Sequence, residues 1–267
     1  MDEKQSAQIS RESINEEFSN KIGRLTKSKA YLDFCEEVYG YRTYLFNMMD
    51  KEQLDFIMNS VPLSSDDTLL DMGCGLGSIL RLLVAKYGCR GVGIDQLKSD
   101  VTDRNGITYI NGDIDQISGY HLTPTVTLSI DSLYFSKDID KLLRQAYDFE
   151  GNRMYLFYSQ YLFDETAGDR STLQGDHTKV ADILNKNKIS YKTTDYSDNE
   201  RLLYKKSLAA LKKRKKAFSE EGNADLYEGK LKEDTMGKHL YDKGLASRYL
   251  YIIERTDASG PISTRLY

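Results

Sequence analysis

The sequence predicts a doubly wound α/β fold in which helices cover both faces of a mostly parallel, seven-stranded sheet. Two observations indicate this class. Short apolar runs rich in β-branched residues alternate with helical segments between Thr68 and Tyr158, as expected for parallel strands that are buried on both faces. A glycine-rich turn directly follows the first of these strands. Right-handed crossovers between such strands produce a doubly wound sheet.

Residues 1–60 are expected to form an N-terminal arm and a helical cap. Residues 1 to about 28 are polar and charged with only scattered apolar positions, which is typical of a mobile arm or of a loosely docked helix. From Tyr31 to Ser60 the apolar residues recur at helical spacing, and Gly40 is expected to divide this stretch into two helices.

Residues 61–160 are expected to hold the core of the sheet. A proline and a run of serines and aspartates mark the loop that precedes it. The apolar residues at 79–87 and at about 138–149 are spaced as in helices. Five strands are predicted, at 68–72, 90–95, 107–110, 125–130 and 153–158.

Residues 161–267 are expected to complete the sheet and to carry a helical lid. Helix 180–184, strand 189–195, a long helix from 200 to about 221 and strand 248–253 are predicted, with a short polar segment before the last strand and a loose tail after it. In the long helix an apolar stripe is flanked by many basic residues. The stripe consists of Tyr204, Leu208, Leu211 and Phe218.

The composition argues against several classes of protein. The 37 Lys and Arg nearly balance the 41 Asp and Glu, for a net charge of −4, so a nucleic-acid partner is disfavoured. No apolar run is long enough to span a membrane, and no secretory signal is recognisable. The three cysteines lack the spacing of a metal site. We expect a cytoplasmic protein without a bound metal, and a homodimer is compatible with these features.

The most informative segment is the turn at residues 70–78, Leu-Asp-Met-Gly-Cys-Gly-Leu-Gly-Ser. Its glycines permit positive φ and close approach of a ligand, and the helix behind them offers unpaired N–H groups. A dinucleotide-binding turn would have glycine at position 78, where this chain has Ser78. The strand ends at Asp71, which would repel a pyrophosphate and attract a cationic ligand. S-adenosylmethionine, with its sulfonium and ammonium groups, suits this turn.

Three further carboxylates lie at the ends of the next three strands. Asp95 is placed to accept both hydroxyls of a ribose, and Asp113 can accept a hydrogen bond from an adenine amino group. Asp131 follows the fourth strand at the point where the strand order reverses, which is the usual ligand crevice. Each acid alone could be a helix cap or a turn residue, but four at successive strand ends favour a binding site.

From about Leu54 to Tyr158 the sequence resembles the class I S-adenosylmethionine-dependent methyltransferases, most closely at 69–78 and in the segment that ends at Asp95. The resemblance implies their Rossmann-like fold, with S-adenosylmethionine as cofactor. It further implies that the glycine turn holds the methionine part, Asp95 the ribose, and Asp113 with Ile114 the adenine. The expected cofactor-binding residues are Asp71, Gly73, Cys74, Gly75, Gly77, Asp95, Gln96, Asp113, Ile114, Asp131 and Ser132.

The segment from Asp195 onward resembles the branch of this family that acts on small molecules. The loop after the fourth strand lacks the Asn/Asp-Pro-Pro-Tyr/Phe sequence of the amino-directed nucleic-acid enzymes. We therefore expect transfer of a methyl group to a small-molecule acceptor by in-line displacement. An RNA methyltransferase, a protein methyltransferase and a non-catalytic S-adenosylmethionine-binding protein are the alternatives.

The residues expected around the acceptor are mostly aromatic or polar. Rings near the methyl donor can stabilise a cationic amine and exclude water, although the same tyrosines could equally pack helices. His177 follows the fifth strand and could act as a base or simply stand at a helix start. The expected catalytic residues are His177, Tyr134 and Tyr158, and the expected substrate-binding residues are Tyr39, Tyr44, Asn47, Ser159 and Gln160.

Overall fold

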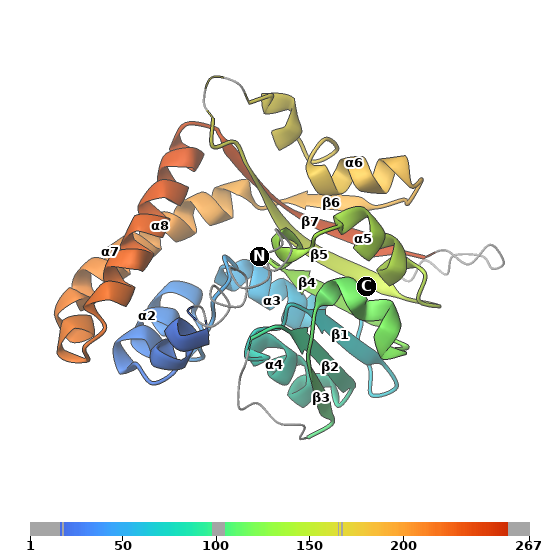
Figure 1. Ribbon diagram of the computed structural model, residues 1–267, viewed down its shortest axis with the longest axis horizontal. Helices are drawn as coiled ribbons and strands as arrows, with labels where there is room; N and C mark the ends of the chain where they lie inside the picture. Colours follow the sequence, from blue (N-terminus) through green and yellow to red (C-terminus); the bar gives the residue numbers. More distant parts are fainter. Residues whose placement is uncertain (1–16, 18, 98–104, 165, 167, 256–267) are drawn as a thin grey trace, which may run out of the picture.

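The structure, a computed structural model, describes residues 17, 19–97, 105–164, 166 and 168–255, and it confirms the seven-stranded doubly wound sheet (Figure 1). The strand order is β3-β2-β1-β4-β5-β7-β6. Neighbouring strands from β3 to β5 are parallel, and β7 is antiparallel to both β5 and β6. The strands are β1 (Thr68–Met72), β2 (Arg90–Asp95), β3 (Ile107–Asn111), β4 (Val126–Ile130), β5 (Arg153–Tyr161), β6 (Lys192–Asp195) and β7 (Ala246–Glu254).

Helices cover both faces of the sheet, and alternate strand residues pack against different helices. Leu69 of β1 packs in a core with residues of α2, α3, α4 and α7, whereas Leu70 packs with residues of α5 and α6, as the two-residue period of a strand requires. The helices are α2 (Lys29–Tyr39), α3 (Lys51–Ser60), α4 (Ser78–Tyr87), α5 (Ile139–Tyr147), α6 (Lys179–Lys186), α7 (Ser197–Glu220) and α8 (Ala224–Asp242), with the short 3-10 helices η1 (Ile114–Tyr120), η2 (Leu133–Phe135) and η3 (Arg170–Leu173).

The N-terminal cap differs from the expectation of two helices separated only by Gly40. Helix α2 ends at Tyr39, and Gly40 caps it with φ +79°. The next ten residues form a loop, because α3 begins only at Lys51, where the side chain of Asp50 accepts a hydrogen bond from the Gln53 N–H. The predicted arm is described only at residue 17 and from residue 19, and the tail after residue 255 lies outside the described residues.

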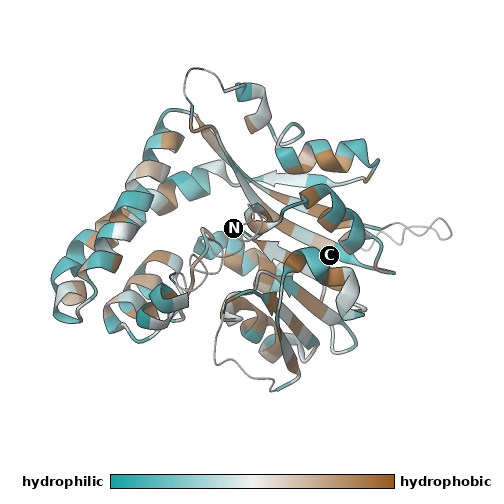
Figure 2. Cartoon of the chain, viewed as in Figure 1, coloured by the Kyte–Doolittle hydropathy of each residue, from teal (hydrophilic) through white to brown (hydrophobic). Residues whose placement is uncertain are grey.

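The segment expected to be short and polar is the 19-residue helix α8, which pairs with α7 to form a hairpin between β6 and β7. Figure 1 shows this hairpin extending away from the sheet, with its tip beside α2. Glycines and charged residues conceal the helical period of α8 in the sequence, and Figure 2 shows most of the hairpin as hydrophilic. Its buried positions still follow helical spacing, since Tyr227, Asp234, Gly237 and Tyr241 are separated by seven, three and four residues. Packing against α7 therefore explains this helix better than local propensity does.

Polar contacts connect the tip of the hairpin to α2 and to the segment before it. The Arg24 guanidinium donates to Gly222 O (2.9 Å) and to both carboxylate oxygens of Asp225 (2.7 and 2.8 Å). The Glu221 carboxylate accepts from Ser28 Oγ (2.5 Å) and from the Ala30 N–H (2.9 Å). None of the helices in the described ranges is long and apolar enough to cross a membrane.

Candidate functional site

A cavity of about 450 Å³ opens at the carboxyl ends of β1, β2 and β4. The strand order reverses at β1, since β2 lies on one side of it and β4 on the other, and ligands bind at such points in open α/β sheets. The loop segment 44–47, Ser19, Ile22 and Glu233 of α8 also line the cavity. Its volume lies within the usual range for small-molecule sites.

The glycine turn has the backbone conformation that the sequence predicted. Gly73, Gly75 and Gly77 have φ values of +75°, +54° and +67°. A Cβ on Gly73 would lie 2.2 Å from the Cβ of Ser132, and one on Gly77 would lie 2.5 Å from a ring carbon of Tyr109. A Cβ on Gly75 would meet nothing within 4 Å, although Gly75 lines the cavity. Gly73 and Gly77 are thus required by the chain itself, whereas Gly75 leaves space that a ligand can occupy.

Asp95 holds the turn in place and keeps acceptor capacity for a ligand. Its Oδ2 accepts from the Gly75 N–H (2.7 Å) and its Oδ1 from the Leu97 N–H (2.7 Å). Each carboxylate oxygen has a second lone-pair direction. Since Asp95 also lines the cavity, it can accept from a vicinal diol while it keeps both backbone contacts.

Asp71 is a buried carboxyl group that has no hydrogen-bond partner among the described residues. Its exposed fraction is only 3%, and it accepts no hydrogen bond from any residue in the described part of the chain. Burial, with a smaller contribution from the charge of Asp95, raises the pKa of Asp71 to about 7. An unpaired buried charge is unfavourable, so a cationic ligand group in the cavity would stabilise the ionised form of Asp71.

Most of the residues predicted to bind the cofactor lie together in this cavity. Asp113 is an exception, because its side chain caps η1 at the Asp115 N–H (3.0 Å) and pairs with Lys137 Nζ (3.0 Å). Gly77 supports the turn through its backbone but does not line the cavity. The predicted residues that line the cavity are Asp71, Gly73, Cys74, Gly75, Asp95, Gln96, Ile114, Asp131 and Ser132.

Asp131 reaches the cavity from the end of β4, and a buried arginine fixes its carboxylate. Arg248 of β7 has no exposed surface, and its Nη1 and Nη2 donate to the two Asp131 oxygens at 2.6 and 3.1 Å. Asp131 Oδ2 also accepts from the Met48 N–H (2.8 Å), which ties the loop before α3 to the sheet. Asp131 adopts φ +52°, an uncommon backbone conformation that such contacts can hold in place.

Arg248 belongs to a larger buried network that also contains Glu200 of α7. Ser159 Oγ, Tyr161 OH and Tyr241 OH donate to the Glu200 carboxylate at 2.5, 2.6 and 2.8 Å. Arg248 Nη1 lies 3.5 Å from Glu200 and donates to Ser159 Oγ at 2.9 Å. This Arg248 network connects β4, β5, β7 and both helices of the hairpin.

Sequence reasoning missed Arg248 and Glu200. Arg248 carried a usable signal, because it is a cation within the otherwise apolar and aromatic final strand. Glu200 carried none, since it is one of many charged residues in α7. Only the packing of α7 across the sheet edge distinguishes its buried carboxylate from the exposed ones.

The predicted substrate-binding residues are divided among three places. Tyr44 and Asn47 line the cavity. Tyr39 is buried in the core, edge-on to Phe34 at 6.3 Å between ring centroids. Ser159 is part of the Arg248 network, and Gln160 lines a separate surface depression beside α6.

The three predicted catalytic residues lie outside the lining of the cavity. His177 is exposed in the same depression as Gln160, 3.9 Å from Asp176. The Tyr134 hydroxyl donates to the Ser159 carbonyl (3.1 Å) and accepts from the Ser159 N–H (2.6 Å). Tyr158 is buried beneath Tyr134, with 5.0 Å between ring centroids. The two tyrosines therefore have packing or hydrogen-bonding contacts within the protein, and none of the three residues lines the cavity.

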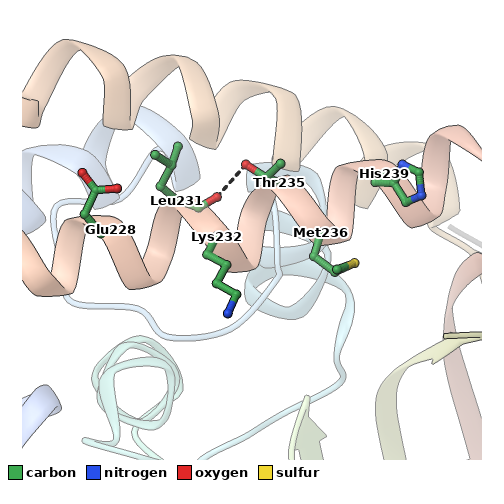
Figure 3. A pocket seen from close by; sticks show the side chains of 6 residues that line it. All are labelled: Glu228, Leu231, Lys232, Thr235, Met236 and His239. Atoms are coloured by element: carbon green, nitrogen blue, oxygen red, sulfur yellow. Dashed lines mark hydrogen bonds between the residues drawn. The ribbon is translucent and has the colours of Figure 1, made fainter.

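A shallow hollow along the outer face of α8 is unlike the cavity, because a single helix supplies its whole lining (Figure 3). The only hydrogen bond drawn there joins residues four positions apart on this helix, from Thr235 Oγ1 to Leu231 O (2.7 Å). Across the described ranges, no group of three or more His, Cys, Asp and Glu side chains could hold a metal ion.

Comparison with known proteins adds a family match and a fold. The family described as methionine biosynthesis protein MetW matches residues 51–132, which contain β1 to β4. No curated protein matches the sequence significantly.

Solved structures of low sequence identity share most of the chain's architecture. The cyclopropane synthase MmaA2 of Mycobacterium tuberculosis is 15% identical with a TM-score of 0.63, over 87% of this chain and 98% of that chain. Phosphoethanolamine N-methyltransferase 2 of Haemonchus contortus, in complex with S-adenosyl-L-methionine, is 14% identical with a TM-score of 0.66, over 85% of this chain and 57% of that chain.

A third structure, an S-adenosylmethionine-dependent methyltransferase of Geobacter sulfurreducens in complex with S-adenosyl-L-homocysteine, is 14% identical with a TM-score of 0.54, over 84% of this chain and 98% of that chain. The chain therefore has the fold of the S-adenosylmethionine-dependent methyltransferases.

Proposed function

We propose that the protein is an S-adenosylmethionine-dependent methyltransferase that acts on a small-molecule acceptor by in-line displacement. The observation that carries the proposal is the Asp71 carboxyl group, which lacks a partner in the described part of the chain and is buried in a cavity beside a positive-φ glycine turn and Asp95. A cationic group together with a ribose diol would satisfy both acids. S-adenosylmethionine contains both.

In this proposal the residues of the cavity bind and orient the cofactor, which supplies a methyl group activated by a sulfonium. Gly75 leaves room for close approach, Asp95 accepts from the ribose, and Asp71 neutralises the positive charge. In-line transfer chiefly needs alignment and exclusion of water. Ile22, Phe46 and the rest of the loop segment 44–47 line the cavity and limit the access of water.

A small acceptor is favoured over RNA by the pairing of the basic side chains on α7. Lys213 and Arg214 each lie 2.6 Å from Glu37 of α2, and Lys206 donates to the Val38 carbonyl (2.8 Å). These cations stabilise the contact between α7 and α2, which reduces their availability to phosphates. The neighbours include an enzyme named for phosphoethanolamine, which also supports a small acceptor.

A reducing compartment, and so the cytoplasm, is part of the same proposal. Its support is that Cys35, Cys74 and Cys89 are all free, and that Cys35 and Cys89 are buried.

Calorimetric titration with S-adenosylmethionine tests the proposal. We expect one site per chain, and we expect Asp95→Asn to bind about tenfold to a hundredfold more weakly, because it loses charge-assisted hydrogen bonds worth about 1.5–3 kcal/mol. Asp138→Asn is the matched control, since Asp138 caps α5 and does not line the cavity. Equal affinities for the wild type and Asp95→Asn, with both folded, would overturn the assignment.

A further inference from the structure

We infer that the methyl acceptor is a small amine, bound in the part of the cavity lined by Tyr44, Phe46, Asn47, Asp131, Phe135 and Glu233. We call this part the acceptor compartment. The inference rests on the proposed function, because it concerns the part of the cavity beyond Asp71, Gly75 and Asp95, and it assigns Asp131 to the acceptor and not to the cofactor. It adds the chemical class of the second substrate.

The charge of the acceptor compartment is the first argument. Two of its six residues are carboxylates, and the cavity has no Lys, Arg or His among its described lining residues. Arg248 contacts Asp131 from the protein interior, but the same guanidinium also lies 3.5 Å from Glu200. One buried cation therefore serves two carboxylates. The Glu200 carboxylate also accepts hydrogen bonds from Ser159 Oγ, Tyr161 OH and Tyr241 OH.

The second carboxylate of the compartment, Glu233, also shares its nearest cation with another acid. Lys230 lies 2.9 Å from Asp234 and 3.5 Å from Glu233, so one ammonium group is shared between two acids. Glu233 lines the mouth of the cavity, where its side chain is about half exposed. A cationic acceptor would thus be attracted by the carboxylates that line the compartment, while a phosphate or carboxylate would be repelled.

Aromatic rings provide the second argument, independent of the carboxylates. Phe46 and Tyr44 stack on Tyr31 at centroid distances of 5.5 and 6.4 Å, which holds both rings at the cavity. Phe135 lines the same space although 73% of its surface is exposed. Aromatic faces beside carboxylates bind ammonium groups through cation–π attraction. They also suit the apolar substituents of an amine.

A third observation indicates that the cavity accepts positive charge. Asp71 is 97% buried, lines the same cavity and has no hydrogen-bond partner among the described residues. In the proposed complex its charge is balanced by the cofactor, which leaves Asp131 and Glu233 for the acceptor. The negative potential therefore extends along the cavity from β1 to α8.

The chemistry of an amine acceptor is balanced without a further reactant. A protonated amine first releases a proton to water at the mouth of the cavity. The nitrogen lone pair then forms the N–CH₃ bond while the S–CH₃ bond breaks, and the bonding electrons return to sulfur. The products are a methylated ammonium ion and the neutral thioether S-adenosylhomocysteine. The rate should rise with pH as more of the amine is neutral.

The test uses binding and transfer by the full-length protein. Methylamine, ethanolamine, putrescine and 2-phenylethylamine are titrated into the complex with S-adenosylhomocysteine, alongside 2-phenylethanol, 3-phenylpropanoate and phenyl phosphate, which lack an amino group. The same panel is offered with methyl-labelled S-adenosylmethionine. We expect binding and label transfer for at least one amine, and neither for the anionic compounds.

Two variants on one helix sharpen the test. Glu233→Gln should raise the dissociation constant of the amine about twofold to fivefold, the usual effect of a partly exposed ion pair, without changing the affinity for S-adenosylhomocysteine. Glu228→Gln is the matched control, because Glu228 lies in the outer hollow of α8 and not in the cavity (Figure 3). A change that is equal in both variants would contradict a role of Glu233 at the acceptor.

The outcomes separate this inference from the proposed function. S-adenosylhomocysteine binding accompanied by methylation of an anionic or alcohol acceptor, or by no amine binding at all, overturns the amine inference and leaves the proposed function standing. Failure to bind S-adenosylhomocysteine overturns the proposed function, and the amine inference with it.

Discussion

At the scale of single residues, the ionisation of Asp71 connects the site to the stability of the fold. Its pKa rises from 3.8 to about 7 on folding because the carboxyl group is buried. Between about pH 4 and 7 the folded chain therefore binds more protons than the unfolded chain. This group lowers stability as the pH rises through that window, by at most on the order of 4 kcal/mol, and the effect is constant above it.

Asp71→Asn should remove this pH dependence. We expect the variant to gain stability over the wild type as the pH rises from 4 to 7, with little difference below pH 4. Its affinity for S-adenosylmethionine should be lower, and should no longer increase with pH toward 7 as that of the wild type does, because a bound cation favours the ionised carboxyl. Urea denaturation and calorimetry at pH 4, 6 and 8 measure both effects. A stability difference that is the same at every pH would contradict the account.

Alanine substitutions at two glycines distinguish the effect of backbone strain on stability from the effect of ligand contact on binding. Gly75 and Gly88 both have positive φ, of +54° and +69°, and a Cβ on either would meet nothing within 4 Å. Alanine at each should therefore cost a similar 1–2 kcal/mol of stability, from strain alone. Only Gly75→Ala should weaken cofactor binding, by at least about tenfold, because only Gly75 lines the cavity. Equal cofactor affinities in the two variants would show that the turn does not contact the ligand.

At the scale of secondary-structure elements, the contact between α7 and α8 depends on a close approach. A Cβ on Gly237 of α8 would lie 2.2 Å from the Tyr204 ring of α7, whereas one on Gly229 of the same helix would meet nothing within 4 Å. Gly237 is therefore a packing residue at the contact between the two helices. Two other glycines, Gly222 and Gly244, flank α8 just outside its two ends, and both have positive φ.

The two helix glycines should respond to alanine in opposite ways. Gly237→Ala should destabilise the protein by about 1–3 kcal/mol, because α7 and α8 must separate. Gly229→Ala should stabilise it by about 0.5–1 kcal/mol, since alanine favours a helix. Thermal unfolding of both variants measures the effects. Stabilisation by both substitutions would mean that Tyr204 does not pack against Gly237.

At the scale of the whole molecule, the sequence predicted the parts of the structure that depend on local pattern. The five core strands and the glycine turn follow from apolar periodicity and from the spacing of Gly73, Gly75 and Gly77. Asp71, Asp95 and Asp131 meet at one cavity because parallel strands end at the same edge of a sheet.

The parts that sequence reasoning missed depend on tertiary packing. Arg248 and Glu200 are 48 positions apart in the numbering and meet only when α7 crosses the sheet edge beside β7. Helix α8 was missed because its polar, glycine-containing sequence is helical through contact with α7. His177 lies between β5 and α6, and Tyr39 is the last residue of α2, but their side chains lie outside the lining of the cavity. Whether such a side chain reaches the cavity depends on tertiary packing, which the local sequence does not show.

A crystal structure of the protein with S-adenosylhomocysteine tests the central claim most directly. The account predicts density for the ligand in the cavity at the ends of β1, β2 and β4, with the ribose hydroxyls on Asp95 and the amino group near Asp71. The sulfur should face the acceptor compartment, which includes Asp131, Phe46 and Glu233. Ligand bound instead in the hollow along α8 or in the depression beside His177, or an empty cavity in crystals grown with saturating ligand, would contradict the account.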